Sequence, residues 1–326
     1  MLAVILEYVL KMKFSQYLGI LLGAIYGILI RILGGTDILS DFYNIYSITF
    51  IWITPIIISL IPIFIATNEL YKSKLKLFFF PFLTIILFAI IALSTGLEDL
   101  LCILILGLPF LIVAGITGMI IGTVIKNKKI NKKLYSIVLL PFLLNPIENL
   151  LPNTVEFFSV ENKIIIEQNQ QIVWKNILEV PEIKDDEYDF GFFNYMGVPR
   201  PIKSELKISE NEIFRIGYFS DNLKLTETIS QRNENKFINF KIHIDKSQLR
   251  NKPTDQHLLK SNYFNFENIS YTLNQIDSNK TELILKCEYK LDSKMNAYAN
   301  FWSKIIINDF EIKLLTALKH KLEKQS

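Results

Sequence analysis

The chain has 326 residues, of which 50% are hydrophobic and 21% are charged, and its mean hydropathy is +0.29. This composition is too apolar for one ordinary soluble domain and too charged for a bundle made only of membrane helices. The formal net charge is +3, and the lysines lie mostly in loops, so no basic stripe points to nucleic acid as a partner.

The apolar and the charged residues are concentrated in different parts of the chain. Apolar runs dominate up to Leu151, whereas charged residues alternate with aromatic and β-branched residues from Pro152 onward. We therefore predict a transmembrane domain over residues 1–151 and a soluble domain over residues 152–326.

The first thirteen residues place an apolar run before their lysines, the reverse of the charge order of a secretory signal. Two interpretations stay open. The segment is a short interfacial helix, or it lies upstream of the true start, with Met12 as the natural first residue.

Five apolar runs follow, and a helix needs about 20 residues to cross the hydrocarbon core. In the first run, Gly19, Gly23 and Gly27 recur at a spacing of four, which predicts either a small-residue packing face or glycines merely tolerated in lipid. The fifth run is short and contains Pro141 and Pro146, so a re-entrant or interfacial segment is the alternative there. The predicted transmembrane helices are 14–33, 46–66, 77–94, 100–125 and 134–151.

The charges of the connecting loops alternate in sign. Residues 126–133 carry five lysines and Lys72, Lys74 and Lys76 form a second basic loop, whereas the connections at 37–41 and 95–99 are acidic. Because basic loops stay cytoplasmic, this pattern places the N-terminus inside and the segment after Leu151 outside, in a bacterial inner or plasma membrane. A non-spanning fifth run would instead leave the soluble domain in the cytoplasm.

Two charged residues lie near the ends of runs. Arg31 is the one loop charge that opposes the alternation, and we expect snorkelling to account for both Arg31 and Glu148. The second, third and fourth runs have no ionisable residue at their centres, which argues against a channel or pump.

The polar half alternates with the period of β-strands. It predicts a strand over 154–167, a short helix ending at Leu178, an antiparallel meander, and one long amphipathic helix over 295–323. The meander strands are predicted at 204–208, 212–219, 224–231, 236–244, 262–275 and 281–291.

Several features of this half together carry a family resemblance: the Val173-Trp174 pair, the Gly197-Val198-Pro199-Arg200-Pro201 loop, the Arg215-Ile216-Gly217-Tyr218-Phe219 strand, and Glu227. Residues 155–323 resemble the START-like superfamily, also called SRPBCC or polyketide cyclase/dehydrase-like. Two departures are the Ser209-Glu210-Asn211 turn, where relatives often have glycines, and the added membrane half.

The resemblance implies a helix-grip fold, in which a bent antiparallel sheet wraps around the C-terminal helix and encloses an apolar pocket. In many relatives that pocket takes lipids, hormones or polyketides. The bulky residues of the last helix either line such a pocket or fill the core. The expected cavity residues are Trp174, Arg215, Tyr218, Glu227, Tyr271, Tyr298, Phe301, Trp302 and Ile305.

The sequence contains no recognisable motif for metal binding, phosphate binding or nucleophilic catalysis. No spacing brings His243, His257 and His320 together as zinc ligands, and no phosphate loop or nucleophile elbow occurs. Cys102 and Cys287 lie in different environments and are expected to be unpaired, packed thiols. We therefore predict no metal and no cofactor.

The leading hypothesis is a membrane-anchored START-like protein that binds a lipid or another hydrophobic small molecule. A cyclase-like or hydrolase-like enzyme is an alternative that needs polar groups converging inside the cavity. Arg215, Glu227 or Tyr271 pointing inward together would favour it, and an all-apolar lining would exclude it. A sensor or scaffold with a protein partner, which the sequence does not identify, is the third possibility.

Overall fold

The computed structural model describes residues 14–34, 47–128, 136–208 and 213–324. The chain divides into two compact units, residues 1–152 and residues 153–326. The first thirteen residues, the acidic loop around Asp37 and Asp41, most of the lysine loop and the Ser209-Glu210-Asn211 turn lie outside the described residues.

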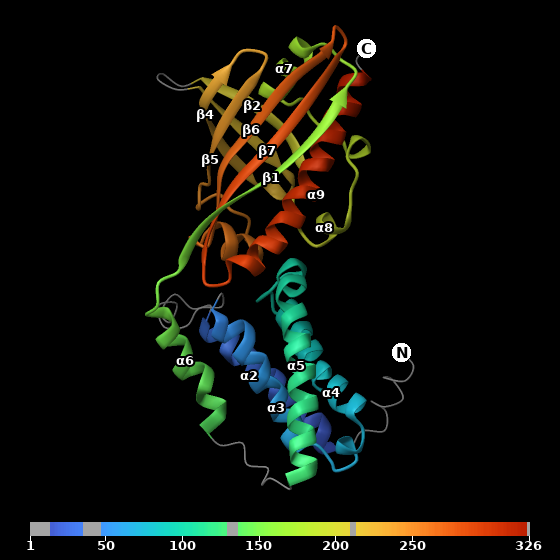
Figure 1. Cartoon of the computed structure of the whole chain (residues 1–326), viewed down its shortest axis with the longest axis vertical. Helices are drawn as coiled ribbons and strands as arrows, with labels where there is room; N and C mark the ends of the chain where they lie inside the picture. The colour runs from blue at the N-terminus through green and yellow to red at the C-terminus, as the bar shows by residue number, and fades with distance from the viewer. Residues whose placement is uncertain (1–13, 35–46, 129–135, 209–212, 325–326) are drawn as a thin grey trace. The chain divides into compact units, whose positions relative to one another are not determined.

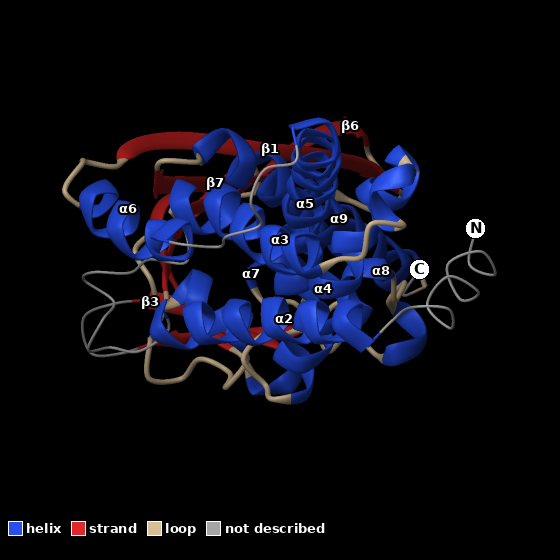
Figure 2. Cartoon of the chain, turned by 90° about the horizontal axis from the view of Figure 1, so that it is seen from below, coloured by secondary structure: helices blue, strands red, loops and turns tan. Residues whose placement is uncertain are grey.

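The described part of the first unit is entirely helical (Figures 1 and 2). Among the described residues, three helices are long and apolar enough to cross a membrane, namely 14–34, 74–94 and 100–127. The two other predicted spans form shorter helices at 49–65 and 137–149, so five spanning helices are not supported. The helices are α2 Phe14–Gly34, α3 Thr54–Ile65 preceded by a π-turn at Thr49–Ile53, α4 Lys74–Ser94, α5 Leu100–Lys128, and α6 Leu140–Asn149 preceded by a 3-10 turn at Ser136–Leu139.

Glycines let the helices of this unit approach closely. Gly19, Gly23 and Gly27 are buried on one face of α2. A Cβ added at Gly23 would lie 2.9 Å from the Ile58 carbonyl oxygen of α3 and 2.7 Å from the Thr84 methyl group of α4. The glycine triplet is therefore a helix-packing face and is not simply tolerated in lipid.

The charged residues near the helix ends do not snorkel, contrary to the expectation. Arg31 is 3% exposed and forms an ion pair with Glu98, which is also 3% exposed, and it donates to the Leu97 carbonyl oxygen at 3.0 Å. Glu148 is 9% exposed and accepts from the Ile48 and Thr49 amides at 2.7 and 2.8 Å. Both charges are buried with partners because an isolated charge in apolar surroundings is strongly disfavoured.

The second unit is a seven-stranded antiparallel sheet of order β1-β7-β6-β5-β4-β3-β2, with one long helix packed along it (Figure 1). This arrangement of an antiparallel sheet and one long C-terminal helix is the helix-grip architecture that the sequence resemblance implied. The strands are β1 Thr154–Ile166, β2 Pro201–Ile208, β3 Ile213–Phe219, β4 Lys224–Asn233, β5 Phe237–His243, β6 Phe264–Asp277 and β7 Lys280–Ser293; the helices are α7 Gln170–Leu178, α8 Phe192–Tyr195 and α9 Asn296–Glu323.

Irregularities in the strand register let the sheet curve around α9. Register shifts occur in β4 between Ile229 and Gln231 and in β6 between Phe266 and Asn268. An extra residue at a bulge bends a strand and increases its twist. The alternation of burial along β7 is regular from Thr281 to Ser293, so every second side chain of that strand faces the core.

Candidate functional site

The concave face of the sheet holds two apolar clusters that α9 covers. The C-terminal half of α9 supplies Leu314, Leu315 and Leu318 to one cluster, which also contains Ile238 and Phe240 of β5. The N-terminal half supplies Ile307 to the other, whose remaining buried members are Val160, Phe264, Cys287, Tyr289 and Leu291. A few polar side chains interrupt this apolar interior, and they are the candidate site.

Arg215 and Glu227 form a buried ion pair on neighbouring strands. They face each other directly in the β3–β4 ladder and are 3% and 4% exposed. The guanidinium also donates to the Ile177 carbonyl oxygen of α7 at 2.5 Å and lies 3.8 Å from the Phe240 ring centroid. Burial disfavours its charge, but the facing Glu227 carboxylate keeps the pKa of Arg215 above its usual value. The pair thus fixes α7 on the sheet.

Tyr271 joins this pair from β6. It is 3% exposed, and its ring centroid lies 5.5 Å from the Arg215 guanidinium carbon. Burial raises the pKa of Tyr271, so its hydroxyl stays protonated at neutral pH. The structure therefore brings three of the predicted residues, Arg215, Glu227 and Tyr271, together inside the domain.

Glu311 of α9 is a functional candidate that sequence reasoning missed. It is 1% exposed, and its Oε2 accepts from the Asn162 side chain of β1 at 2.8 Å. Its Oε1 has no hydrogen-bond partner among the residues that the structure describes. Burial raises the pKa of Glu311 to about 8, because the Asn162 side chain and the Cys287 backbone offset only part of the desolvation. At neutral pH the group is mostly an uncharged acid with unused hydrogen-bonding capacity.

A signal for Glu311 was present in the helix pattern. Ile307, Glu311, Leu314 and Leu318 recur at spacings of four, three and four, which places the acid in the middle of the apolar stripe. The prediction of an amphipathic helix over 295–323 did not single out this acid.

Trp174 lies in the same apolar cluster as Tyr271, whereas Tyr218 lies on the other face of the sheet. Trp174 is 3% exposed, packs in the first cluster, and donates from Nε1 to Glu234 at 3.0 Å. Tyr218 alternates with Arg215 on β3 and donates to Glu205 at 3.1 Å, with Lys203 5.1 Å from its ring centroid. It therefore belongs to a half-buried polar cluster on the opposite face of the sheet.

The four predicted residues at the start of α9 are not in the core. Phe301 is 53% exposed and Ile305 is 38% exposed, whereas Tyr298 and Trp302 are half-buried. Ile307 points into the second cluster, and the helical rotation of 100° per residue turns these four side chains at least 120° away from it. We refer to Tyr298, Phe301, Trp302 and Ile305 as the outer aromatic face of α9.

Cys102 and Cys287 are buried and do not form a disulfide, as predicted. Cys287 of β7 lies in the second cluster, and burial raises the pKa of its thiol well above the usual value. A thiol that does not ionise at neutral pH is a poor nucleophile.

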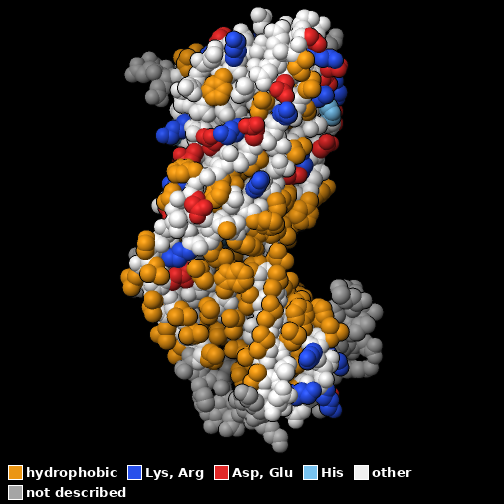
Figure 3. Space-filling model, viewed as in Figure 1, with side chains coloured by type: hydrophobic (Ala, Val, Ile, Leu, Met, Phe, Trp, Pro, Cys, Tyr) orange, Lys and Arg blue, Asp and Glu red, His pale blue; other side chains and the backbone are white. Residues whose placement is uncertain are grey.

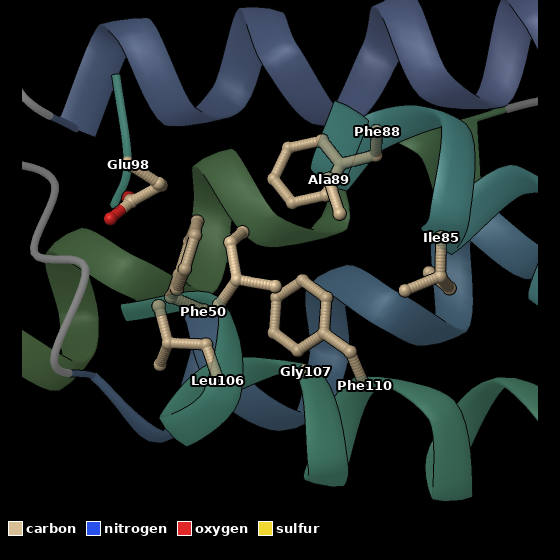
Figure 4. Close-up of a pocket in the computed structure, with 9 residues that line it drawn as sticks. Phe50, Ile85, Phe88, Ala89, Glu98, Leu106, Gly107 and Phe110 are labelled. Carbon is tan, nitrogen blue, oxygen red and sulfur yellow. The ribbon is translucent and has the colours of Figure 1, made fainter. Parts of the chain in front are cut away.

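The first unit also contains a small cavity (Figure 4). Its volume is about 20 Å³, and the rings of Phe50, Phe88 and Phe110 surround it, with Glu98 at one side. A water molecule needs roughly 10–15 Å³ of such space, so the cavity is too small for an organic ligand.

Comparison with known proteins leaves the activity open. No family model matches the sequence, and no curated protein sequence matches it. Solved structures similar to this chain include an aromatase/cyclase from Streptomyces sp. R1128, with 10% identity, a TM-score of 0.34, and coverage of 52% of this chain and 96% of that one. Norcoclaurine synthase from Thalictrum flavum, in complex with dopamine and hydroxybenzaldehyde, has 8% identity, a TM-score of 0.32, and coverage of 53% and 90%. At such identities the likeness concerns the fold alone.

Glu311 predicts a distinctive dependence of stability on pH. Its pKa is raised in the folded state, so the folded protein keeps this proton while the unfolded chain loses it near pH 4.5. The contribution of Glu311 to the free energy of unfolding should therefore fall as the pH rises from about 4.5 to 8, by roughly 5 kcal/mol at 1.36 kcal/mol per pKa unit. Urea unfolding of the detergent-solubilised full chain, from pH 4.5 to 9, measures this.

The Glu311→Gln variant should lose that decline and become more stable than the wild type above pH 8. Glu323→Gln, a change on the same helix at a partly exposed position whose side chain accepts from the Glu167 amide, is the matched control and should keep it. If the free energy of unfolding changed with pH in the same way for the wild type and for Glu311→Gln, the raised pKa of Glu311 would be contradicted.

Proposed function

We propose that the chain is a membrane-anchored helix-grip protein whose C-terminal unit binds one hydrophobic or amphipathic small molecule, such as a lipid, between the sheet and α9. The observation that carries the proposal is Glu311, a buried acid with an unused oxygen between two apolar clusters. Natural small-molecule sites combine a mostly apolar lining with a few such polar groups.

The chemistry of Glu311 indicates the kind of ligand. A protonated carboxyl group can donate one hydrogen bond, and its free oxygen can accept another. The surrounding side chains, such as Val160, Ile307 and Tyr289, offer hydrocarbon and aromatic contacts. A molecule with an apolar body and one oxygen-containing end matches both.

A membrane supplies such molecules directly. Hydrophobic side chains occupy much of the visible surface of the first unit, with a few lysine or arginine side chains, whereas the second unit carries mixed charges (Figure 3). The three long apolar helices agree with insertion in a bilayer. We therefore favour membrane lipids as the source of the ligand.

A cyclase-like or hydrolase-like enzyme is the second candidate, because the convergence of Arg215, Glu227 and Tyr271 favours it. Glu311, with a pKa of about 8, would be the general acid of such an enzyme. However, the Arg215 guanidinium is occupied by Glu227 and the Ile177 carbonyl oxygen, which favours a structural role for the pair.

Filling the interior tests ligand binding. Ile307 is 7% exposed and faces the sheet, whereas Ile312 of the same helix is 47% exposed. After purification of the full chain and detergent exchange, lipid extraction and mass spectrometry should find about one retained lipid per chain. Ile307→Trp should reduce that amount at least fivefold, and the matched control Ile312→Trp should not.

Overpacking at Ile307 could also unfold the unit, so circular dichroism must show unchanged secondary structure. Glu311→Gln, which keeps the shape of the side chain, provides a second test and should change which lipid class is retained. Equal retention by all variants, or no retained lipid in the wild type, would refute the proposal.

We further propose that the N-terminus is cytoplasmic and the C-terminal unit lies on the outer face of a bacterial inner or plasma membrane. The supporting argument is the alternation of loop charges, and Arg31, its one exception, is neutralised by Glu98. Three crossings would also put the two ends on opposite sides, but placing both basic loops inside requires the short helices at 49–65 and 137–149 to cross together with the three long ones.

A reporter fused after Ser326 tests the topology. Alkaline phosphatase fused there should be active and a fluorescent protein that folds only in the cytoplasm should be dark. An inactive phosphatase and a bright fluorescent protein would place the C-terminal unit in the cytoplasm. In that case α6 would not cross the membrane.

A further inference from the structure

The outer aromatic face of α9 has no part in the interior site. Phe301 and Ile305 are exposed, and the ring of Phe301 packs edge-on against Trp302 with centroids 5.5 Å apart. Exposed Lys304 lies within the same turns. An aromatic patch of this kind on a surface otherwise rich in charges marks an interaction site.

The chain itself restricts how far this face can lie from the membrane. Four residues, Leu150 to Asn153, separate the end of α6 from the first residue of β1, Thr154. Fully extended, they allow at most about 18 Å between the Cα atoms of Asn149 and Thr154. Leu150 is 84% exposed, so the connection is itself apolar at its start.

Hydrogen bonds attach the first turn of α9 to the beginning of β1. The Asn296 side chain donates to the Thr154 carbonyl oxygen at 2.6 Å, and Lys294 donates to the Asn153 side chain at 3.1 Å. Phe301 follows Asn296 by five residues, which is about 8 Å along a helix. The outer aromatic face therefore lies toward the end of the second unit that carries Thr154, the first residue of β1.

We propose that the outer aromatic face, Tyr298, Phe301, Trp302 and Ile305, contacts the interfacial region of the lipid bilayer and seats the domain on it. This inference rests on the proposed membrane anchoring. Tyrosine and tryptophan are enriched at the level of lipid headgroups, and a lysine beside them reaches phosphate groups with its charge. The arrangement also presents the first turns of α9 to the lipid that the domain would bind.

A fluorescent probe on α9 tests the contact in the full chain in nanodiscs. Cys102 and Cys287 are buried, so a cysteine introduced by Phe301→Cys can be labelled with the environment-sensitive dye NBD, with the unmutated chain as the labelling background. His320→Cys, an exposed position on the same helix about 29 Å away, is the matched control. Spin-labelled phosphatidylcholine and aqueous iodide serve as the two quenchers.

The probe at 301 should be quenched at least threefold more by spin-labelled lipid than the probe at 320, and less by iodide. Equal iodide quenching at both positions would overturn the docking proposal. Protection from iodide without quenching by lipid would indicate a protein partner or a second copy, and would overturn it as well. Because lipid retention is measured separately, a failure here is distinguishable from a failure of ligand binding.

Discussion

The cost of burying charge in apolar surroundings is the constraint on which both units depend. Arg31 in the helical unit and Arg215 in the sheet unit each lie within a few per cent of complete burial, and each is held by a glutamate and a backbone carbonyl oxygen. Such pairs contribute little net stability, but the loss of one partner leaves a very unfavourable charge. They therefore determine which segments must lie together.

Glu311 departs from this rule, because among the described residues an asparagine side chain donates to it and no cation lies within hydrogen-bonding distance. A carboxyl group in this position avoids the cost of burial by keeping its proton. The fold thus places an uncharged acid under α9, between an apolar cluster on each side. A ligand with an oxygen-containing end would satisfy the group that the protein itself leaves unsatisfied.

The secondary structure of the second unit could be read from the sequence because its signals are local. Alternation along β7 and the stripe of α9 follow from the periods of a strand and a helix, and the predicted bounds differ from the observed ones by only a few residues. Arg215 and Glu227 were each expected to line a cavity, but their pairing was not predicted, because it depends on the register of β3 against β4.

The predictions that failed concerned residues whose surroundings are set by tertiary contacts. Snorkelling was assigned to Arg31 because no sequence pattern shows that residue 98 lies beside residue 31. The aromatic residues near Phe301 were expected to line a cavity because their type suggests a core, but their helical phase turns them outward. Glu311 was overlooked because a single acid in an apolar stripe was interpreted by its type and not by its position.

Photo-crosslinking with a diazirine-bearing fatty acid, in native membranes containing the full chain, tests the account most directly. Ligand binding between the sheet and α9 predicts adducts on the inward stripe from Ile307 to Leu314 and on the inward residues of β7, from Thr281 to Leu291. Adducts confined to the apolar helices between residues 14 and 149 would contradict it, because the second unit would then enclose no lipid.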